Sequence, residues 1–289
     1  MITGFSDHVL THQGVDIAYS IGGDGPPLVL LHGFPQTRAM WAHIAPALAQ
    51  GRRVICPDLR GYGASGKPAD MAAYSFRAMG GDILTLMDHL GHDRFDLVGH
   101  DRGARTAHRI ALDAADRVNS LTVMDITPTH HLLSELSHRV AKSYYHWFFL
   151  AQPAPFPETL IAADPDYFFQ SCLLGWGGAT LADFDPAQLD AYRKAWRDPQ
   201  TIRGMCNDYR AAIAHDLALD QADLHRKIDC PLLVLYGADG AMAQAYDVPA
   251  TWAKRCRDIQ AGTVPGGHFF PDTAPQQTLE AITAFLQRV

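Results

Sequence analysis

The chain has 289 residues, of which 47% are hydrophobic and 19% charged, the composition of an ordinary globular protein. Its formal net charge of -7 at pH 7 argues against a nucleic-acid-binding surface, because such a surface needs clustered Lys and Arg. The absence of a membrane-length apolar stretch, of a secretory signal pattern and of paired cysteine motifs predicts a cytoplasmic enzyme.

Short apolar runs with strand propensity alternate with helical patterns along the chain. The runs cover residues 15–19, 28–31, 53–56, 95–98, 121–124 and 232–236. Several are continuously hydrophobic, which is typical of strands buried on both faces. Between two of them, residues 76–90 carry one apolar stripe at helical spacing, and Gly91 is placed to end that helix. This alternation predicts a parallel sheet with right-handed crossovers.

The alternation stops after Pro128. Residues from 129 to about 224 are rich in aromatics and helix formers and contain no convincing strand. The strand pattern resumes at 232–236, and the chain ends in an amphipathic helix whose apolar side carries Leu279, Ile282, Leu286 and Val289. We therefore expect a core made of residues 1–128 and 221–289, with an inserted helical cap at 129–220. Their junction should form the ligand cleft.

The segment FDLVGHDRGAR, residues 95–105, has the pattern of a buried strand, a tight turn and a helix. Asp101 lies in the turn between Gly99 and Gly103, which is the small-x-nucleophile-x-small pattern of a nucleophile elbow. Glycines suit this turn because a strained reversal leaves no room for side chains beside the nucleophile. The alternative is a turn with a solvated aspartate. An aspartate nucleophile excludes a serine route, but its carboxylate can displace a leaving group from saturated carbon and form an ester.

Hydrolysis of that ester requires a general base and a site for the oxyanion. We expect His268, in VPGGHFF, to be the base, although a surface histidine is the alternative in a chain with fifteen histidines. The backbone N–H groups of Phe34, in HGFP, and of Arg102 are the expected oxyanion donors. The base also needs an orienting acid, for which Asp125 and Asp239, each following a strand pattern, are both candidates.

Two arginines follow the nucleophile at a spacing of three residues. Arg102 and Arg105 can face one spot at the helix N-terminus, where the helix dipole adds to their attraction for an anion. The planar guanidinium matches a carboxylate through paired hydrogen bonds. We therefore predict a substrate with a carboxylate near the reacting carbon. The alternative is a salt bridge or a nucleic-acid contact on a helix surface.

Three residues of the expected cap can donate hydrogen bonds from largely apolar side chains: His146, Trp147 and Tyr209. A departing halide needs such donors in a dry pocket, and fluoride needs them most because it is small and basic. The alternative is that these aromatics only pack in the core. The chain has no H-E-x-x-H motif and no Cys/His ligand spacing, so we expect neither a metal nor any other cofactor.

Four motifs make the chain resemble the α/β-hydrolase superfamily over nearly its full length: HGFP (32–35), DLRGYGAS (58–65), GHDRGA (99–104) and GGHF (266–269). The Asp-Arg-x-x-Arg sequence, the cap His-Trp pair and the later cap Tyr resemble the fluoroacetate (haloacetate) dehalogenases, hydrolases that act on carbon–halide bonds. The resemblance implies an α/β-hydrolase fold with a mostly parallel eight-stranded sheet and an inserted helical cap, and often a homodimer. It favours Asp125 over Asp239, because many superfamily members carry the acid where this chain has Gly240, whereas haloacetate dehalogenases carry it at the position of Asp125.

The resemblance also implies a role for each candidate. Asp101 is the nucleophile, His268 the base, Asp125 the orienting acid, Arg102 and Arg105 the carboxylate clamp, and His146, Trp147 and Tyr209 the halide pocket. We predict hydrolysis of a small-molecule 2-haloacid, with fluoroacetate to glycolate as the leading case. One alternative is an epoxide hydrolase, although those enzymes typically have Trp where this chain has Arg102. The other is a non-catalytic small-molecule receptor, which need not retain a nucleophile, a base and an acid.

Overall fold

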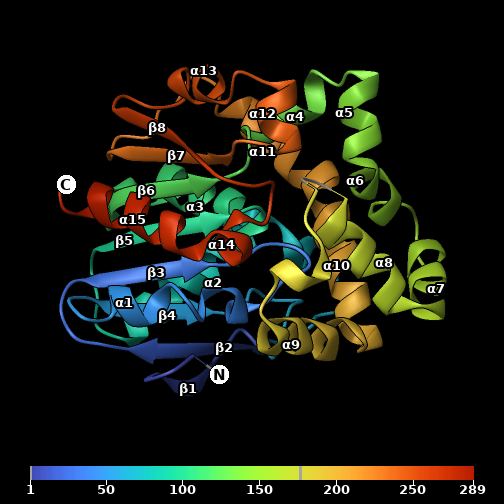
Figure 1. Ribbon diagram of the computed structural model, residues 1–289, viewed down its shortest axis with the longest axis horizontal. Helices are drawn as coiled ribbons and strands as arrows, with labels where there is room; N and C mark the ends of the chain where they lie inside the picture. The colour runs from blue at the N-terminus through green and yellow to red at the C-terminus, as the bar shows by residue number, and fades with distance from the viewer. Residues whose placement is uncertain (1, 176–177) are drawn as a thin grey trace.

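A single eight-stranded sheet forms the centre of the computed structural model, which describes residues 2–175 and 178–289 (Figure 1). The strands, in chain order, are β1 (Ser6–His12), β2 (Val15–Gly22), β3 (Pro27–Leu31), β4 (Arg53–Pro57), β5 (Phe95–His100), β6 (Val118–Met124), β7 (Leu232–Gly237) and β8 (Ile259–Val264). Their order across the sheet is β1-β2-β4-β3-β5-β6-β7-β8. Strand β2 pairs antiparallel with β1 and β4, and the pairs from β4 to β8 are parallel. The predicted mostly parallel eight-stranded sheet is confirmed.

The central strands are the ones that the apolar runs predicted. Every residue of β5 is buried, and so are most residues of β3, β4, β6 and β7, because helices cover both faces of the sheet. Strands β1 and β8 have no continuous apolar run, and sequence patterning missed them. Both lie at the edges of the sheet, where most of their side chains keep contact with solvent.

Helices of the core lie on both sides of the sheet. They are η1 (Arg38–Trp41), α1 (Ala45–Leu48), η2 (Met71–Tyr74), α2 (Phe76–His89), α3 (Arg102–Asp113), η3 (Ala115–Arg117), α12 (Ala241–Ala245), α13 (Val248–Ala253), α14 (Phe270–Thr273) and α15 (Pro275–Leu286). Helices α1 and α15 cover one face, and α2 and α3 pack together on the other (Figure 1). The predicted helix 76–90 is confirmed as α2, and Gly91 follows it at φ +75°.

The C-terminal helix is confirmed with one correction. Ile282 and Leu286 of α15 are buried, and Leu279 packs against the core. Val289 was expected on the same apolar side, but it is 50% exposed. The helix ends at Leu286, so the helical spacing that would have placed Val289 against the core no longer applies.

Between β6 and β7 the described residues form helices and no strand. These are α4 (Thr129–Ser134), α5 (His138–Ser143), α6 (Tyr145–Leu150), α7 (Phe156–Ala163), α8 (Pro165–Leu174), η4 (Leu181–Asp183), α9 (Pro186–Trp196), α10 (Pro199–Ala211), the π-helical turn η5 (Ala212–Asp216) and α11 (Leu217–Ala222). They lie together at one end of the sheet, on the right of Figure 1. We call them the cap helices; the cap limits of 129 and 220 stay a prediction.

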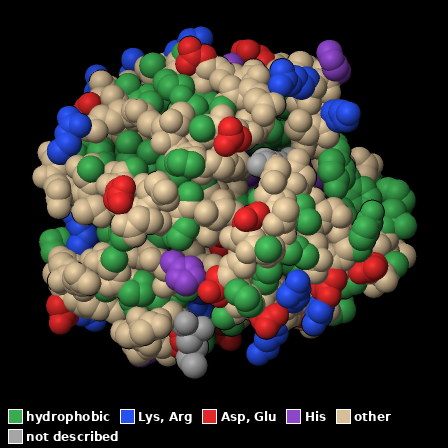
Figure 2. Space-filling view, viewed as in Figure 1, with side chains coloured by type: hydrophobic (Ala, Val, Ile, Leu, Met, Phe, Trp, Pro, Cys, Tyr) green, Lys and Arg blue, Asp and Glu red, His purple; other side chains and the backbone are tan. Residues whose placement is uncertain are grey.

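The outer cap helices carry exposed apolar side chains. Phe156 and Leu160 of α7 and Tyr167 of α8 are each more than half exposed, and hydrophobic side chains gather at that edge of the molecule (Figure 2). In the part of the chain that the structure describes, no helix is both long and apolar enough to cross a membrane.

Candidate active site

Asp101 stands in a sharp turn between β5 and α3. Its φ of 47° and ψ of -113° are unusual for a residue with a side chain, and such a conformation costs about 1–3 kcal/mol. A β-carbon at Gly99 would lie 2.6 Å from the backbone of Ala104, and one at Gly103 would lie 2.4 Å from the backbone of His32. The two glycines are therefore required by close backbone approach, as the strand-turn-helix prediction demanded.

The Asp101 carboxylate is buried and held by the loop that follows β3. The backbone N–H of Phe34 donates to Asp101 Oδ2 at 3.0 Å. Burial alone would raise the pKa of Asp101, but the positive charges of His268, Arg102 and Arg105 lower it below its ordinary value. The side chain is therefore an ionised carboxylate with one oxygen already on a backbone donor. The backbone N–H of Arg102, the other predicted oxyanion donor, belongs to the first residue of helix α3.

His268 and Asp125 meet although 143 residues separate them in the sequence. His268 Nδ1 lies 2.6 Å from Asp125 Oδ2, and Asp125 Oδ1 accepts a hydrogen bond from Gly237 N–H at 3.0 Å. Burial would lower the pKa of His268, but the hydrogen bond and charge of Asp125, with the charge of Asp101, raise it above its usual value. Asp239, the rival acid, is exposed, and its carboxylate accepts from Gly266 N–H at 3.3 Å. The geometry thus favours Asp125 as the acid that orients His268.

Arg102 is fully buried and paired with Asp208 of α10. Its Nε donates to Asp208 Oδ2 at 2.8 Å, and its Nη2 donates to the Asp208 carbonyl at 3.0 Å and to Oδ1. Its guanidinium carbon lies 4.2 Å from the ring centre of Tyr209 and 4.9 Å from that of Trp147. Burial would lower the pKa of Arg102, but Asp208 raises it. Among the described residues, Nη1 has no hydrogen-bond partner.

The pairing with Asp208 was missed by sequence reasoning. Arg102 was expected to bind the substrate carboxylate together with Arg105, and two of its three nitrogens are already bound within the protein. The only available signal was the position of Asp208 directly before Tyr209 on the same predicted cap segment. Spacing along one chain does not reveal which arginine such an acid will meet.

Arg105 is equally buried but is held by neutral oxygens. Its Nη1 donates to the Thr127 carbonyl at 3.0 Å and lies 3.1 Å from Thr129 Oγ1. Within the described ranges no carboxylate forms a salt bridge with Arg105, and its Nε makes no hydrogen bond. Burial lowers the pKa of Arg105, although the charge of Asp101 acts in the opposite direction. Arg105 therefore offers an incompletely paired cation beside the nucleophile.

The predicted halide residues come together around Phe34. The ring centres of His146 and Tyr209 lie 5.8 Å and 5.2 Å from that of Phe34, and Trp147 lies 5.3 Å from Tyr209. Burial holds the pKa of His146 well below its usual value, so the ring is neutral. In the described part of the molecule, Trp147 Nε1 and Tyr209 Oη have no hydrogen-bond partner. Two donors therefore stand unused in an apolar surrounding.

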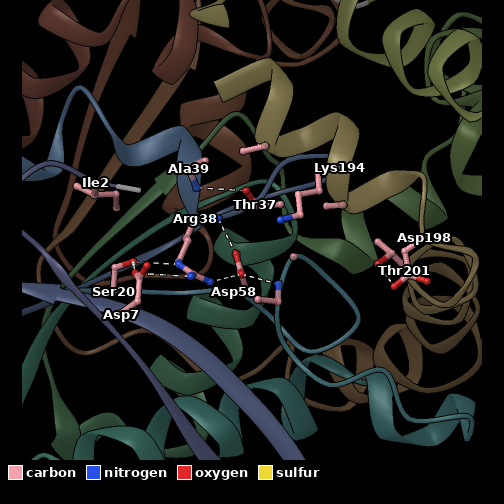
Figure 3. Close-up of a pocket in the computed structure, with 14 residues that line it drawn as sticks. Ile2, Asp7, Ser20, Thr37, Arg38, Ala39, Asp58, Lys194, Asp198 and Thr201 are labelled. Carbon is pink, nitrogen blue, oxygen red and sulfur yellow. Dashed lines mark hydrogen bonds and ion pairs between the residues drawn. The ribbon is translucent and has the colours of Figure 1, made fainter. Parts of the chain in front are cut away.

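A groove of about 510 Å³ lies elsewhere, between η1, β1, β2 and the cap helices α9 and α10 (Figure 3). Arg38 crosses it, donating from its backbone to Asp58 Oδ1 at 2.8 Å and from Nε to Ser20 Oγ at 2.9 Å. None of the residues that line the groove is a predicted site residue. The catalytic candidates therefore lie outside this groove.

Comparison with known proteins gives the family of the chain. The family model for the alpha/beta hydrolase fold matches residues 26–275. The chain belongs to the α/β hydrolases. This hydrolase is 50% identical to a fluoroacetate dehalogenase of Burkholderia sp., over 99% of its own chain and 95% of that protein. It is 30% identical to a soluble epoxide hydrolase of Corynebacterium sp. strain C12, over 99% and 98% of the two chains.

A solved structure gives the same result for the fold. The crystal structure of an α/β hydrolase from Nostoc sp. PCC 7120 is 44% identical, covers 100% of both chains and superposes with a TM-score of 0.97. The predicted fold and the predicted kinship with the fluoroacetate dehalogenases are therefore confirmed.

Proposed function

We propose that this hydrolase replaces the halogen of a small 2-haloacid with hydroxyl, and that conversion of fluoroacetate to glycolate is the leading reaction. The observation that carries the proposal is the buried guanidinium of Arg105, which has no salt-bridge partner in the described chain and lies near the ionised Asp101. A substrate carboxylate would supply the missing negative charge. The 50% identical fluoroacetate dehalogenase supports the same substrate class.

The first half-reaction makes an ester. Arg105, with Nη1 of Arg102, binds the substrate carboxylate and directs the neighbouring carbon toward Asp101. An Asp101 oxygen attacks that carbon, the carbon–halogen bond breaks, and the halide leaves with the bonding electrons. Trp147 and Tyr209 hold the unused donors that stabilise the departing halide, together with neutral His146.

The second half-reaction hydrolyses the ester. Ester formation removes the negative charge of Asp101, which had helped to raise the pKa of His268. The pKa of His268 therefore falls after the first half-reaction, and the neutral ring can accept a proton from water. The resulting hydroxide adds to the Asp101 carbonyl carbon, and the Phe34 N–H stabilises the oxyanion. Collapse releases the 2-hydroxyacid; the overall products are hydroxyacid, halide and one proton.

The two alternative functions, an epoxide hydrolase and a non-catalytic receptor, use the same fold but fit the residues of the site less well. An epoxide hydrolase could employ Asp101, His268 and Asp125 in similar roles, and the Corynebacterium relative shows that the kinship extends to such enzymes. A neutral epoxide, however, would leave the charge of Arg105 uncompensated in a buried site. A non-catalytic receptor would not need the Asp125–His268 pair beside a strained, ionised Asp101.

We also propose a cytoplasmic location. The five cysteines are free thiols, four of them buried, which is usual where the environment is reducing. Fractionation of the native cells with an antibody against the chain tests this proposal; recovery with the exported proteins would refute it.

The deciding experiment measures halide release from fluoroacetate, chloroacetate and a neutral bromoalkane by the wild type and by Asp101→Asn. We expect fluoride from fluoroacetate and a loss of at least about 10³-fold in the variant, because the amide is a poor nucleophile. Asp239→Asn is the matched control, since Asp239 is exposed, and should retain activity. Reaction of the bromoalkane alone would contradict the carboxylate clamp.

A single turnover in ¹⁸O-water tests the covalent route. The first product should carry an unlabelled oxygen from Asp101, and label should enter the enzyme, as mass spectrometry can show. Label in the first product at bulk enrichment would mean that water attacks the substrate directly.

A further inference from the structure

A buried chain of hydrogen bonds leads from the base to a cap helix. His100 Nε2 lies 2.8 Å from the carbonyl oxygen of His268, and His100 Nδ1 lies 3.1 Å from Oε1 of Gln36. Gln36 Nε2 donates a hydrogen bond to Asp272 Oδ2. The Tyr192 hydroxyl donates to Asp272 Oδ1 at 2.7 Å. All five residues are buried, so solvent does not compete for these contacts.

This network joins separate parts of the active site. Gln36 lies in the loop after β3 that also carries the Phe34 N–H, and His100 ends β5, directly before the nucleophile. Asp272 lies in α14, which follows the loop of the base, and Tyr192 lies on cap helix α9. None of the roles assigned above uses the side chain of Gln36, His100, Asp272 or Tyr192.

The proton positions in the network follow from the chemistry of its acceptors. The carbonyl oxygen of His268 can only accept, so His100 Nε2 must carry a hydrogen. Burial lowers the pKa of His100 to about 4, so at neutral pH the ring holds one hydrogen and Nδ1 is an acceptor. The donor to Nδ1 must then be the NH₂ group of Gln36. In the structure the Gln36 oxygen lies toward His100 and the Gln36 nitrogen lies toward Asp272, so this reasoning requires the amide to be turned end for end, which scarcely changes its shape. The Gln36 oxygen then faces Asp272, and that contact is a hydrogen bond only if Asp272 is protonated.

The environment of Asp272 is compatible with a protonated carboxyl. Burial raises the pKa of Asp272 to about 7, although the hydrogen bonds from Tyr192 and, before the amide is turned, from Gln36 Nε2 favour the charged form. The negative charge of Asp185, at the start of α9, raises this pKa further. Around this carboxyl the titratable groups are thus Tyr192 and Asp185 on the cap side and, through Gln36, His100 on the core side.

Loss of the proton from Asp272 would reverse the direction of the hydrogen bonds in the network. The ionised carboxylate accepts from the Gln36 NH₂ group, which turns the amide oxygen toward His100 Nδ1. His100 must then place its single hydrogen on Nδ1, and its Nε2 presents a lone pair to the carbonyl oxygen of His268. Two acceptors face each other at that contact, and the loop that carries the base loses a hydrogen bond.

We propose that Asp272 is a positioning residue that acts in its protonated form: through Gln36 and His100 it holds the backbone of His268 in the geometry needed for hydrolysis of the ester. This inference rests on the proposed role of His268 as general base. Formation of the ester depends on Asp101 and the arginines, so it should not respond to the protonation of Asp272. Hydrolysis of the ester should slow as Asp272 ionises.

Two variants separate the protonation of Asp272 from its packing. Asp272→Asn keeps the shape and supplies an NH₂ group to the Gln36 oxygen and a carbonyl to the Tyr192 hydroxyl, so it mimics the protonated acid at every pH. Tyr192→Phe removes a hydrogen bond that favours the charged form of Asp272 and should move its titration to higher pH. The wild type, Asp272→Asn and Tyr192→Phe are compared with chloroacetate by rapid quench, which measures the two half-reactions separately.

Between pH 6 and 8, the protonated fraction of a group with a pKa of about 7 falls by about tenfold. We expect the contribution of this network to the wild-type rate of ester hydrolysis to fall by the same factor. The rate in Asp272→Asn, divided by that of the wild type, should rise over the same range. In Tyr192→Phe the decline should begin at higher pH. Superimposable pH profiles of the wild type and Asp272→Asn would overturn the proposal.

A spectroscopic measurement is independent of turnover. In ¹⁵N-histidine NMR spectra, the signals of His100 are identified by their loss in His100→Gln. They should report hydrogen on Nε2 below pH 7 and on Nδ1 above it in the wild type, and hydrogen on Nε2 throughout in Asp272→Asn. Unchanged His100 signals in the wild type would refute the network. Absence of halide release from every haloacid would instead refute the proposed function, while these spectra would still test the network.

Discussion

The core half and the cap half of this active site are held in place by different means. Asp101 and Asp125 stand at the carboxyl ends of the neighbouring strands β5 and β6, both at positive φ, so the backbone of the sheet fixes where their carboxylates lie. Trp147 and Tyr209 are fixed by ring packing and by contact with the Arg102 guanidinium. In the proposed mechanism, the sheet carries the residues that form and hydrolyse the ester, and the cap carries the donors that stabilise the departing halide.

The two arginines of α3 differ in the charge of their partners. Arg102 is bound to the carboxylate of Asp208 in cap helix α10, whereas Arg105 is bound to neutral oxygens of Thr127, in the loop after β6, and of Thr129, at the start of cap helix α4. Tyr62 also donates to Asp208, at 2.6 Å, so the carboxylate is well satisfied. Arg102 therefore joins the core to the cap, and Arg105 keeps more of its charge for the substrate.

The largest effect should come from the base in the core half. His268→Gln should leave ester formation intact but lower steady-state turnover by about 10²–10⁴-fold, because water loses its proton acceptor. Mass spectrometry of the intact protein after incubation with chloroacetate should show the trapped carboxymethyl ester, and the double variant with Asp101→Asn should show none. Full turnover in His268→Gln would mean that another group is the base.

An intermediate effect, on the KM for the substrate, is expected when Arg105 of the carboxylate clamp is replaced. Arg105→Lys keeps the positive charge but loses the planar fork, so KM for chloroacetate should rise by about tenfold with a smaller change in kcat. Arg109→Lys is a matched control, because Arg109 lies on the same helix but pairs with Asp113 and Asp223. Equal KM values for the wild type and Arg105→Lys would remove Arg105 from the carboxylate site.

The smallest effect should come from a single donor of the cap half, and it should depend on the halogen. Tyr209→Phe preserves the ring that packs on Arg102 and removes only the hydroxyl. Fluoride release should fall by about tenfold, and bromide release from bromoacetate by about twofold, because fluoride concentrates more charge on a smaller atom. The ratio of the two rates is measured with ion-selective electrodes. An equal loss for both halides would show that the hydroxyl acts elsewhere.

Local sequence determined the core half of the site. Gly99 and Gly103 predicted the tight turn at Asp101, because close backbone approach tolerates no side chain there. The continuous apolar runs identified the buried central strands, since a strand covered on both faces needs apolar residues throughout. The choice between Asp125 and Asp239 required the family resemblance, because both acids follow strand patterns and only one reaches His268.

Tertiary structure alone decided which charged and polar groups are paired. Arg102 meets Asp208 across 106 residues, and Gln36 meets Asp272 across 236. The edge strands β1 and β8 likewise depend on their neighbours in the sheet rather than on a pattern of their own. Periodicity and glycine placement describe the local path of the backbone. A hydrogen bond instead requires two distant side chains within about 3 Å, and only the complete packing of the chain sets that distance.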